Sequence, residues 1–242
     1  MASTWVYRMC RGLEFVRAHG VLLAAVVIIS GGTLAFVDIA GDMREGSGLP
    51  FDTYILHTLH PGPDPSDPVG PAWLYRAMAD LTSMGSLAVL TLIAIIAVGY
   101  LVLCRRMLQA IALIVGLGGG LALSESLKQL FMRTRPPEIY RASESLNASF
   151  PSGHTLMATV FYLTIGVMLA GALKHRFLRV YVLLVGMLLA VIVGITRVYL
   201  GVHWASDVLA GWSVGAAWAT LCWLVERTIQ NSLKPLASAD SD

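Results

Sequence analysis

The sequence predicts an all-α protein, a six-helix transmembrane bundle. Hydrophobic residues make up 56% of the 242 residues and charged residues only 13%, with a mean hydropathy of +0.70. Soluble domains carry about 25% charged residues. Six apolar segments are each long enough to cross about 30 Å of hydrocarbon. The sequence has no fixed-period repeat and no low-complexity tract, so the six segments predict a single domain over residues 1–242. The segments cover residues 21–37, 87–104, 107–127, 155–173, 180–196 and 208–225.

The first apolar segment follows Arg8, Arg11 and Arg17, an arrangement that is also found in signal peptides. Its apolar stretch is long, however, and residues 36–40 form a poor cleavage site, so we favour a membrane-spanning helix. The polar stretch that follows, residues 38–80, is rich in Pro, Gly and Asp. It predicts an outer loop with room for a short surface helix.

The connections between the later segments alternate in charge. Arg105 and Arg106 separate the second and third segments, and three basic residues lie between the fourth and fifth. With both termini in the cytoplasm, the inner side collects ten of the 17 basic residues, as the positive-inside rule expects. Compact size and this pattern indicate a bacterial inner membrane. The ten are Arg8, Arg11, Arg17, Arg105, Arg106, Lys174, Arg176, Arg179, Arg227 and Lys234.

Composition also excludes several classes of function. The net charge of +2 leaves no basic stripe for nucleic acid once the inner-face arginines are set aside. The three cysteines, Cys10, Cys104 and Cys222, have no paired spacing, so we expect neither a disulfide nor a zinc site. The acids on the outer side are scattered and offer no compact metal-binding cage, which predicts no metal.

A first polar cluster lies at the end of the third apolar segment, where Arg135 follows Lys128 by seven residues. Pro136 biases Arg135 away from helical geometry, so the two side chains can converge from different directions. Phosphoryl transfer spreads negative charge over three equatorial oxygens, which need fixed cationic donors. Alternatively, both residues simply extend to the lipid headgroups, as single basic residues at a membrane edge commonly do.

A second cluster, residues 151–154 (Pro-Ser-Gly-His), immediately precedes the fourth apolar segment. It places Ser152 and Gly153 at a helix amino terminus, where free N–H groups and the helix dipole favour an anion. Gly153 lets a phosphate oxygen approach closely. His154 is placed to give a proton to a leaving oxygen near neutral pH. In isolation, the motif could equally be a simple helix cap.

The third cluster opens the sixth helix with Arg197, His203 and Asp207. If His203 is already helical, Asp207 lies on the same face one turn later. Its carboxylate can bind one ring nitrogen and leave the other with a free lone pair for attack on phosphorus. A capping or interfacial role is the alternative, but these charged groups are costly at a membrane edge without a function. Because two crossings separate the third and fifth segments, all three clusters share one side, predicted to be the outer face.

These clusters, Lys-x6-Arg-Pro, Pro-Ser-Gly-His and Arg-x5-His-x3-Asp, resemble in order the three signature motifs of the type 2 phosphatidic acid phosphatase superfamily. The motif-bearing region covers residues 128–207, and residues 80–86 also look like bacterial members. One departure is Thr196, where the family usually has Ser. The resemblance implies that His203 forms a phosphohistidine, that Asp207 orients it and that His154 protonates the leaving group, with no cofactor. The phosphate-binding residues would be Lys128, Arg135, Ser152, Gly153 and Arg197.

The resulting prediction is a membrane phosphatase that acts on phosphatidate, phosphatidylglycerol phosphate or undecaprenyl diphosphate and releases phosphate at the periplasmic face. A lipid phosphotransferase remains an alternative, because the same motifs serve both reactions. A noncatalytic lipid binder or transporter is less favoured, because binding alone does not need His154, His203 and Asp207. Vanadium-dependent haloperoxidases share this site but are soluble. The expected partners are membrane lipids, and the sequence does not indicate an oligomeric state.

Overall fold

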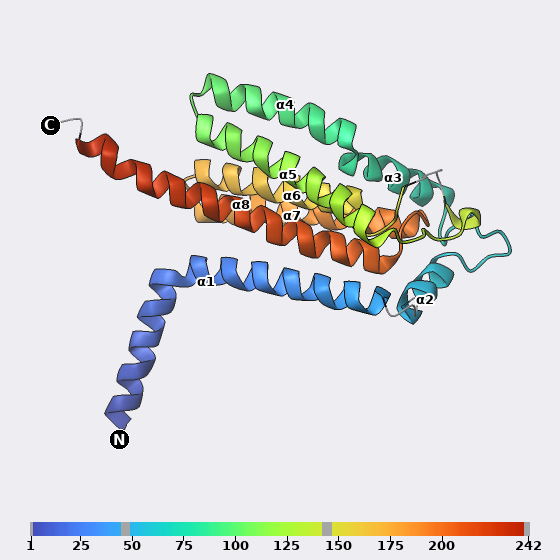
Figure 1. Ribbon diagram of the computed structural model, residues 1–242, viewed down its shortest axis with the longest axis horizontal. Helices are drawn as coiled ribbons and strands as arrows, with labels where there is room; N and C mark the ends of the chain where they lie inside the picture. Colours follow the sequence, from blue (N-terminus) through green and yellow to red (C-terminus); the bar gives the residue numbers. More distant parts are fainter. Residues whose placement is uncertain (1, 45–48, 142–146, 240–242) are drawn as a thin grey trace.

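The computed structural model is a bundle of long helices lying roughly side by side (Figure 1). It describes residues 2–44, 49–141 and 147–239, with side chains described at 20, 22–43, 49–141 and 147–233. The side chains of Arg8, Arg11, Arg17, Cys10 and Lys234 therefore lie outside the described residues. Within the described ranges every regular element is helical, which confirms the all-α prediction. The elements are α1 (Ala2–Arg44), α2 (Pro50–Leu59), α3 (Ala72–Thr82), η1 (Ser83–Gly85), α4 (Leu87–Leu103), α5 (Met107–Phe131), η2 (Glu138–Tyr140), α6 (Gly153–Ala172), α7 (Arg176–Tyr199) and α8 (Ala205–Ala239).

Five described helices are long and apolar enough to cross a membrane on their own. They are Leu22–Met43, Met107–Phe131, Gly153–Ala172, Arg176–Tyr199 and Ala205–Leu233. The sixth predicted span is a bent pair, Ala72–Gly85 with Leu87–Leu103, whose axes differ by 49°. Ser86 makes the break, because it adopts an extended conformation and its hydroxyl accepts from the Val89 N–H at the start of α4. The chain is an integral membrane protein.

The predicted outer loop, residues 38–80, contains more helix than its composition suggested. Helix α1 continues to Arg44, α3 begins at Ala72, and the short α2 lies between them. Two residues of α2, Asp52 and Leu56, are buried against the bundle. The surface helix expected in this segment is therefore packed on the protein rather than free in solvent.

Helix α6 forms the centre of the bundle and contacts α4, α5, α7 and α8. Its inward residues Leu156, Val160 and Phe161 join Leu90 and Val193 in the main apolar core. Small residues let the backbones approach closely, as is common in membranes. A Cβ at Gly186 of α7 would lie 2.7 Å from the Tyr162 carbonyl oxygen of α6, so only glycine fits there.

The α7–α8 turn, α2, η2 and the start of α6 gather at the same end of the bundle (Figure 1). The backbone N–H of Ser152, before α6, donates to the carbonyl of Asp207 in the first turn of α8 at 3.0 Å. This bond joins the second and third sequence clusters directly. The polar clusters are thus held together by backbone as well as by side chains.

Candidate active site

The three sequence clusters meet at one pocket of about 220 Å³ at this end of the bundle. Six of the eight predicted site residues line it: Lys128, Arg135, Gly153, His154, Arg197 and His203. The other two, Ser152 and Asp207, are fully buried behind its surface. The structure therefore brings together residues that lie as far apart as 128 and 207 in the chain.

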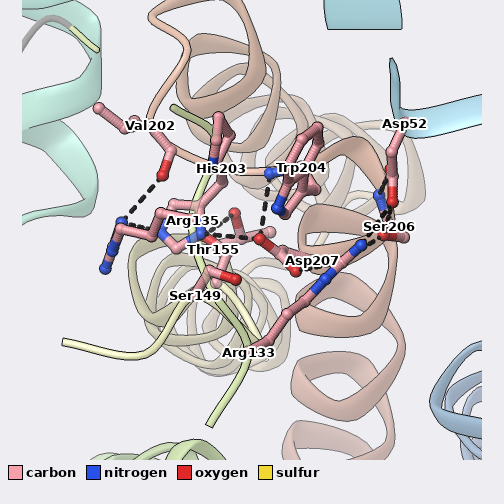
Figure 2. A network of polar contacts seen from close by, with 12 residues as sticks. Asp52, Arg133, Arg135, Ser149, Thr155, Val202, His203, Trp204, Ser206 and Asp207 are labelled. Carbon is pink, nitrogen blue, oxygen red and sulfur yellow. Dashed lines mark hydrogen bonds and ion pairs between the residues drawn. The ribbon is translucent and has the colours of Figure 1, made fainter. Parts of the chain in front are cut away.

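His203 has a different partner on each ring nitrogen (Figure 2). Its Nδ1 lies 3.3 Å from Oδ2 of Asp207, and its Nε2 lies 3.2 Å from Nη1 of Arg135. A guanidinium only donates, so Nε2 accepts and the ring hydrogen lies on Nδ1, facing the carboxylate. The lone pair on Nε2 therefore points to Arg135, and both residues line the pocket.

Burial is the main influence on the charge of His203, which is 2% exposed. The pKa of His203 is lowered to about 4: burial is the largest cause, the hydrogen bond and charge of Asp207 act in the opposite direction, and the charges of Arg197 and Arg135 add to the lowering. The imidazole is thus neutral at pH 7, the form that has a lone pair to donate.

His203 and Asp207 of the third cluster are hydrogen-bonded, but His203 is not in the helix that their spacing suggested. Helix α8 begins at Ala205, so His203 lies in the preceding turn. The backbone N–H of Trp204 donates to Asp207 Oδ2 at 3.0 Å and holds the carboxylate towards that turn. The left-handed backbone of Gly201, with φ of +65°, reverses the chain after α7.

Cationic side chains line much of the rest of the pocket. Arg197 is 8% exposed, donates from Nη1 to Thr82 Oγ1 at 3.1 Å, and has a buried Nε with no partner among the described residues. Arg135 is fixed through its Nε to the carbonyl of Asn147 at 2.8 Å and through its Nη1 to that of Val202 at 2.9 Å. Such fixed donors suit an anion that arrives without its water shell.

Lys128 reaches the start of α6, where a Cβ on Gly153 would lie only 3.1 Å from its Nζ. The ammonium also pairs with Glu125 Oε1 at 2.8 Å. Ser152 accepts a hydrogen bond from Thr155 Oγ1 at 2.9 Å and keeps its own hydroxyl hydrogen. A glycine at position 153 thus leaves the space in which ammonium and helix N–H groups can meet one anion.

Two polar residues of α5 at the pocket were missed by the sequence reasoning. Ser124 is 1% exposed, and its hydroxyl has no partner among the described residues although it lies at the pocket wall. Glu125 lines the same wall. Their spacing from Lys128 on α5, three and four residues, is the signal that could have found them.

A second missed feature is the environment of Asp207 (Figure 2). Its Oδ1 accepts from Nη1 of Arg133 at 2.6 Å, and Nη2 of the same guanidinium donates to Asp52 of α2 at 2.7 Å. In the sequence, Arg133 is a basic residue between Lys128 and Arg135 of the first cluster. No sequence signal linked it to Asp52, which is 81 residues away.

The fold and the site define an integral membrane protein with a cationic pocket built around a neutral histidine. Residues 109–230 match the model of the PAP2 superfamily, half of the chain. The chain belongs to the PAP2 superfamily, which confirms the resemblance seen in its motifs.

Two relatives support the assignment. The chain is 36% identical over 148 residues to phosphatidylglycerophosphatase B of Bacillus subtilis, which covers 59% of this chain and 70% of the relative. It is 30% identical over 123 residues to the undecaprenyl-diphosphatase of Sulfolobus acidocaldarius, which covers 49% of this chain and 55% of that protein.

Two solved structures have the same fold. The crystal structure of the transmembrane PAP2 type phosphatidylglycerolphosphate phosphatase from Bacillus subtilis matches with a TM-score of 0.75 and 26% identity over 84% of this chain and 98% of that one. The crystal structure of Aquifex aeolicus LpxE matches with a TM-score of 0.54 and 22% identity, covering 75% and 97% of the two chains, and this likeness concerns the fold alone.

Proposed function

We propose that this protein hydrolyses lipid phosphates or diphosphates through a phosphohistidine at His203, without a metal ion. The names of its relatives support lipid phosphatase activity and suggest phosphatidylglycerophosphate and undecaprenyl diphosphate as substrates. The observation that carries the mechanism is the arrangement of His203, with Nδ1 on Asp207 and the Nε2 lone pair in the cationic pocket.

The binding step uses the fixed cations and the amino terminus of α6. The substrate phosphate is held by Lys128, Arg135 and Arg197, with the Ser152 hydroxyl and the N–H groups that begin at Gly153 as further donors. These charges meet the equatorial oxygens of the transition state, so the chain itself supplies the positive charge that a metal provides elsewhere. Apolar residues at the pocket, among them Leu87, Leu121 and Met157, suit the first carbons of a lipid tail.

The chemical step is an in-line displacement on phosphorus. The Nε2 lone pair of His203 forms the N–P bond while the bond from phosphorus to the lipid oxygen breaks. His154, at the first turn of α6 and lining the same pocket, gives its proton to the departing oxygen. Asp207 stabilises the positive charge that develops on the imidazole.

Hydrolysis reverses these roles. His154 takes a proton from water, the water oxygen bonds to phosphorus, and the N–P bond breaks to restore neutral His203 and release inorganic phosphate. With both termini in the cytoplasm, this release occurs on the periplasmic side. The basic residues described at the opposite end, including Arg105 and Arg179, support that orientation.

The test is inorganic phosphate release by purified protein in detergent with EDTA. Wild type is compared with His203→Ala on phosphatidate, phosphatidylglycerol phosphate and undecaprenyl diphosphate. Release by wild type alone supports the proposal and ranks the substrates. Activity that EDTA abolishes and magnesium restores contradicts the metal-independent mechanism, and lipid consumption without free phosphate indicates transfer to a second lipid instead.

A further inference from the structure

The buried carboxylate of Asp52 is the least expected charge in this end of the bundle. Asp52 lies in the first turn of α2 and is 2% exposed. An ionised carboxylate at such a position is costly unless its oxygens are satisfied. Both are: Oδ1 accepts from the Ser206 N–H at 2.9 Å, and Oδ2 accepts from the Ser206 hydroxyl at 2.5 Å and from Arg133 at 2.7 Å.

Arg133 connects this carboxylate to the catalytic one (Figure 2). Its guanidinium spans Asp52 and Asp207, with 2.7 Å and 2.6 Å contacts, and Nη1 also donates to the Ser206 hydroxyl at 2.7 Å. The ring of Trp204 lies 5.6 Å from the guanidinium carbon and covers it. Held at several points, Arg133 has little freedom to rotate, and it fixes Oδ1 of Asp207 in turn.

The charges in this network matter as well as its geometry. Arg133 alone would neutralise Asp207 and weaken its attraction for the Nδ1 hydrogen of His203. Asp52 is a second carboxylate on the same guanidinium, so Asp52, Arg133 and Asp207 together carry a net negative charge. Asp207 therefore keeps the charge that a developing imidazolium needs.

We propose that Asp52 and Arg133 are positioning residues for the nucleophile: Asp52 anchors Arg133, and Arg133 holds Asp207 with Oδ2 towards His203. This inference rests on the proposed function. It also assigns a role to α2, which lies outside residues 109–230 that match the superfamily. The amino-terminal part of the chain thus contributes to the reactivity of a histidine far along the sequence.

The test separates positioning from substrate binding. Asp52→Asn keeps the shape of the side chain but removes its charge, while the cationic pocket is untouched. We expect kcat for phosphate release to fall by about 10- to 100-fold, the range found when a residue that orients a metal ligand is changed, with KM within about threefold. The matched control is Asp64→Asn in the same outer segment, because Asp64 likewise accepts from the N–H and hydroxyl of a serine, Ser66, but is exposed. It should leave both constants unchanged.

A double-mutant cycle tests the route through the guanidinium. If Asp52 acts through Arg133, the Asp52→Asn/Arg133→Gln double variant should have the kcat of Arg133→Gln alone. Wild-type kcat for Asp52→Asn, a loss confined to KM, or losses that multiply in the double variant would overturn the inference. His203→Ala is measured in the same assay. If it is inactive, only the positioning role of Asp52 and Arg133 is overturned and the proposed function stands. If it is active, the proposed function is wrong as well.

A milder variant applies if Asp52→Asn does not purify as a monodisperse protein. Ser206→Ala removes the hydroxyl that bridges Asp52 and Arg133 but keeps their direct ion pair. We expect kcat to fall by about 3- to 10-fold at unchanged KM, because both hydrogen bonds of this hydroxyl are lost while the ion pair remains. Wild-type kcat in this variant contradicts the inference.

Discussion

At the scale of single residues, His203 is subject to two influences that act in opposite directions on its pKa. It is buried, which keeps it neutral, and it contacts a carboxylate, which favours its charged form. Burial is the larger influence, and the pKa lies at about 4. In the proposed mechanism, this balance lets the side chain attack phosphorus at neutral pH and still accept positive charge once the N–P bond has formed.

The first prediction concerns the acid limb of kcat/KM, which reports ionisations of the free enzyme and free substrate. Because the pKa of His203 is lowered, the neutral form persists as the pH falls past 6.5 and is lost only near about pH 4. Measuring kcat/KM with two aryl phosphates whose phosphate groups differ in pKa separates the ionisation of the enzyme from that of the substrate. An acid limb caused by the substrate shifts with the pKa of the substrate, whereas one caused by the enzyme does not. A substrate-independent limb near pH 6.5 would contradict the assignment.

The second prediction concerns Ser124, whose hydroxyl is buried at the pocket without a described partner. We expect it to donate to a phosphate oxygen, so Ser124→Ala should raise KM about tenfold, the effect of losing a hydrogen bond to a charged group. Steady-state kinetics on one lipid phosphate measures this. Thr164→Val is the control, because the Thr164 hydroxyl is also buried and unpartnered but lies away from this pocket. Equal effects from both variants would contradict a specific role for Ser124.

Six of the eight residues singled out in the sequence line the pocket, because residues of these kinds are chemically informative at the edge of an apolar segment. Single basic residues are common there, but Lys128, Arg135 and Arg197 follow a motif pattern, and a histidine with an acid four residues later suggests a paired imidazole. Asp52 could not be found in this way, because a single acid in a Pro- and Gly-rich segment is ordinary. Its role arises only when the fold places α2 beside the start of α8.

At the scale of elements, the turn between α7 and α8 decides where His203 points. Gly201 has a φ of +65°, and a Cβ there would collide with the carbonyl of Tyr140 in η2. The turn and η2 are therefore packed backbone to backbone, two residues before His203. This close contact helps to position His203, which lines the pocket.

The third prediction follows from that packing. Gly201→Ala should lower the free energy of unfolding by about 1–2 kcal/mol from the left-handed backbone alone, and more from the collision. It should also reduce kcat, because His203 shifts with the turn. Gly99→Ala on α4 is the control, since a Cβ at Gly99 meets nothing within 4 Å. Unfolding in detergent and phosphate release measure the two effects, and a Gly201→Ala protein that matches wild type in both would contradict this account.

Element boundaries were less predictable than element types. Hydropathy predicted all six spans, but the second of them, α4, is only 17 residues long and reaches a full span together with α3 and η1. Helix α3 contains Arg76 and Asp80, so its sequence is too polar to predict a membrane helix. The bend at Ser86 comes with a local helix cap, in which the Val89 N–H donates to the Ser86 hydroxyl, and hydropathy carries no signal for a cap.

At the scale of the whole molecule, the pocket and its polar residues lie at one end of the bundle, and the short turns α4–α5 and α6–α7 lie at the other (Figure 1). Charge asymmetry in the sequence predicted this division, because the basic residues not needed for the pocket lie mostly in those turns and near the termini. The side of the membrane that each end faces remains a proposal.

The fourth prediction tests that orientation with cysteine labelling in intact cells. Cys104 is exposed in the α4–α5 turn and should react with a membrane-impermeant maleimide only after the cells are opened. An Asp64→Cys variant in the outer segment should react in intact cells. Cys10 and Cys222 are replaced by serine in both proteins, and Cys104 in the second. Labelling of Cys104 from outside would reverse the proposed topology.

The central claim is a phosphoryl group on His203, and trapping it is the most direct measurement. Wild-type, His203→Ala and His154→Ala proteins are mixed with a ³²P-labelled aryl phosphate in EDTA and quenched in alkali, in which phosphohistidine survives. We expect label on the peptide that contains His203 in the wild type and in His154→Ala, since an aryl leaving group needs little protonation. We expect none in His203→Ala. Turnover without labelled protein, or label on another residue, would contradict the mechanism.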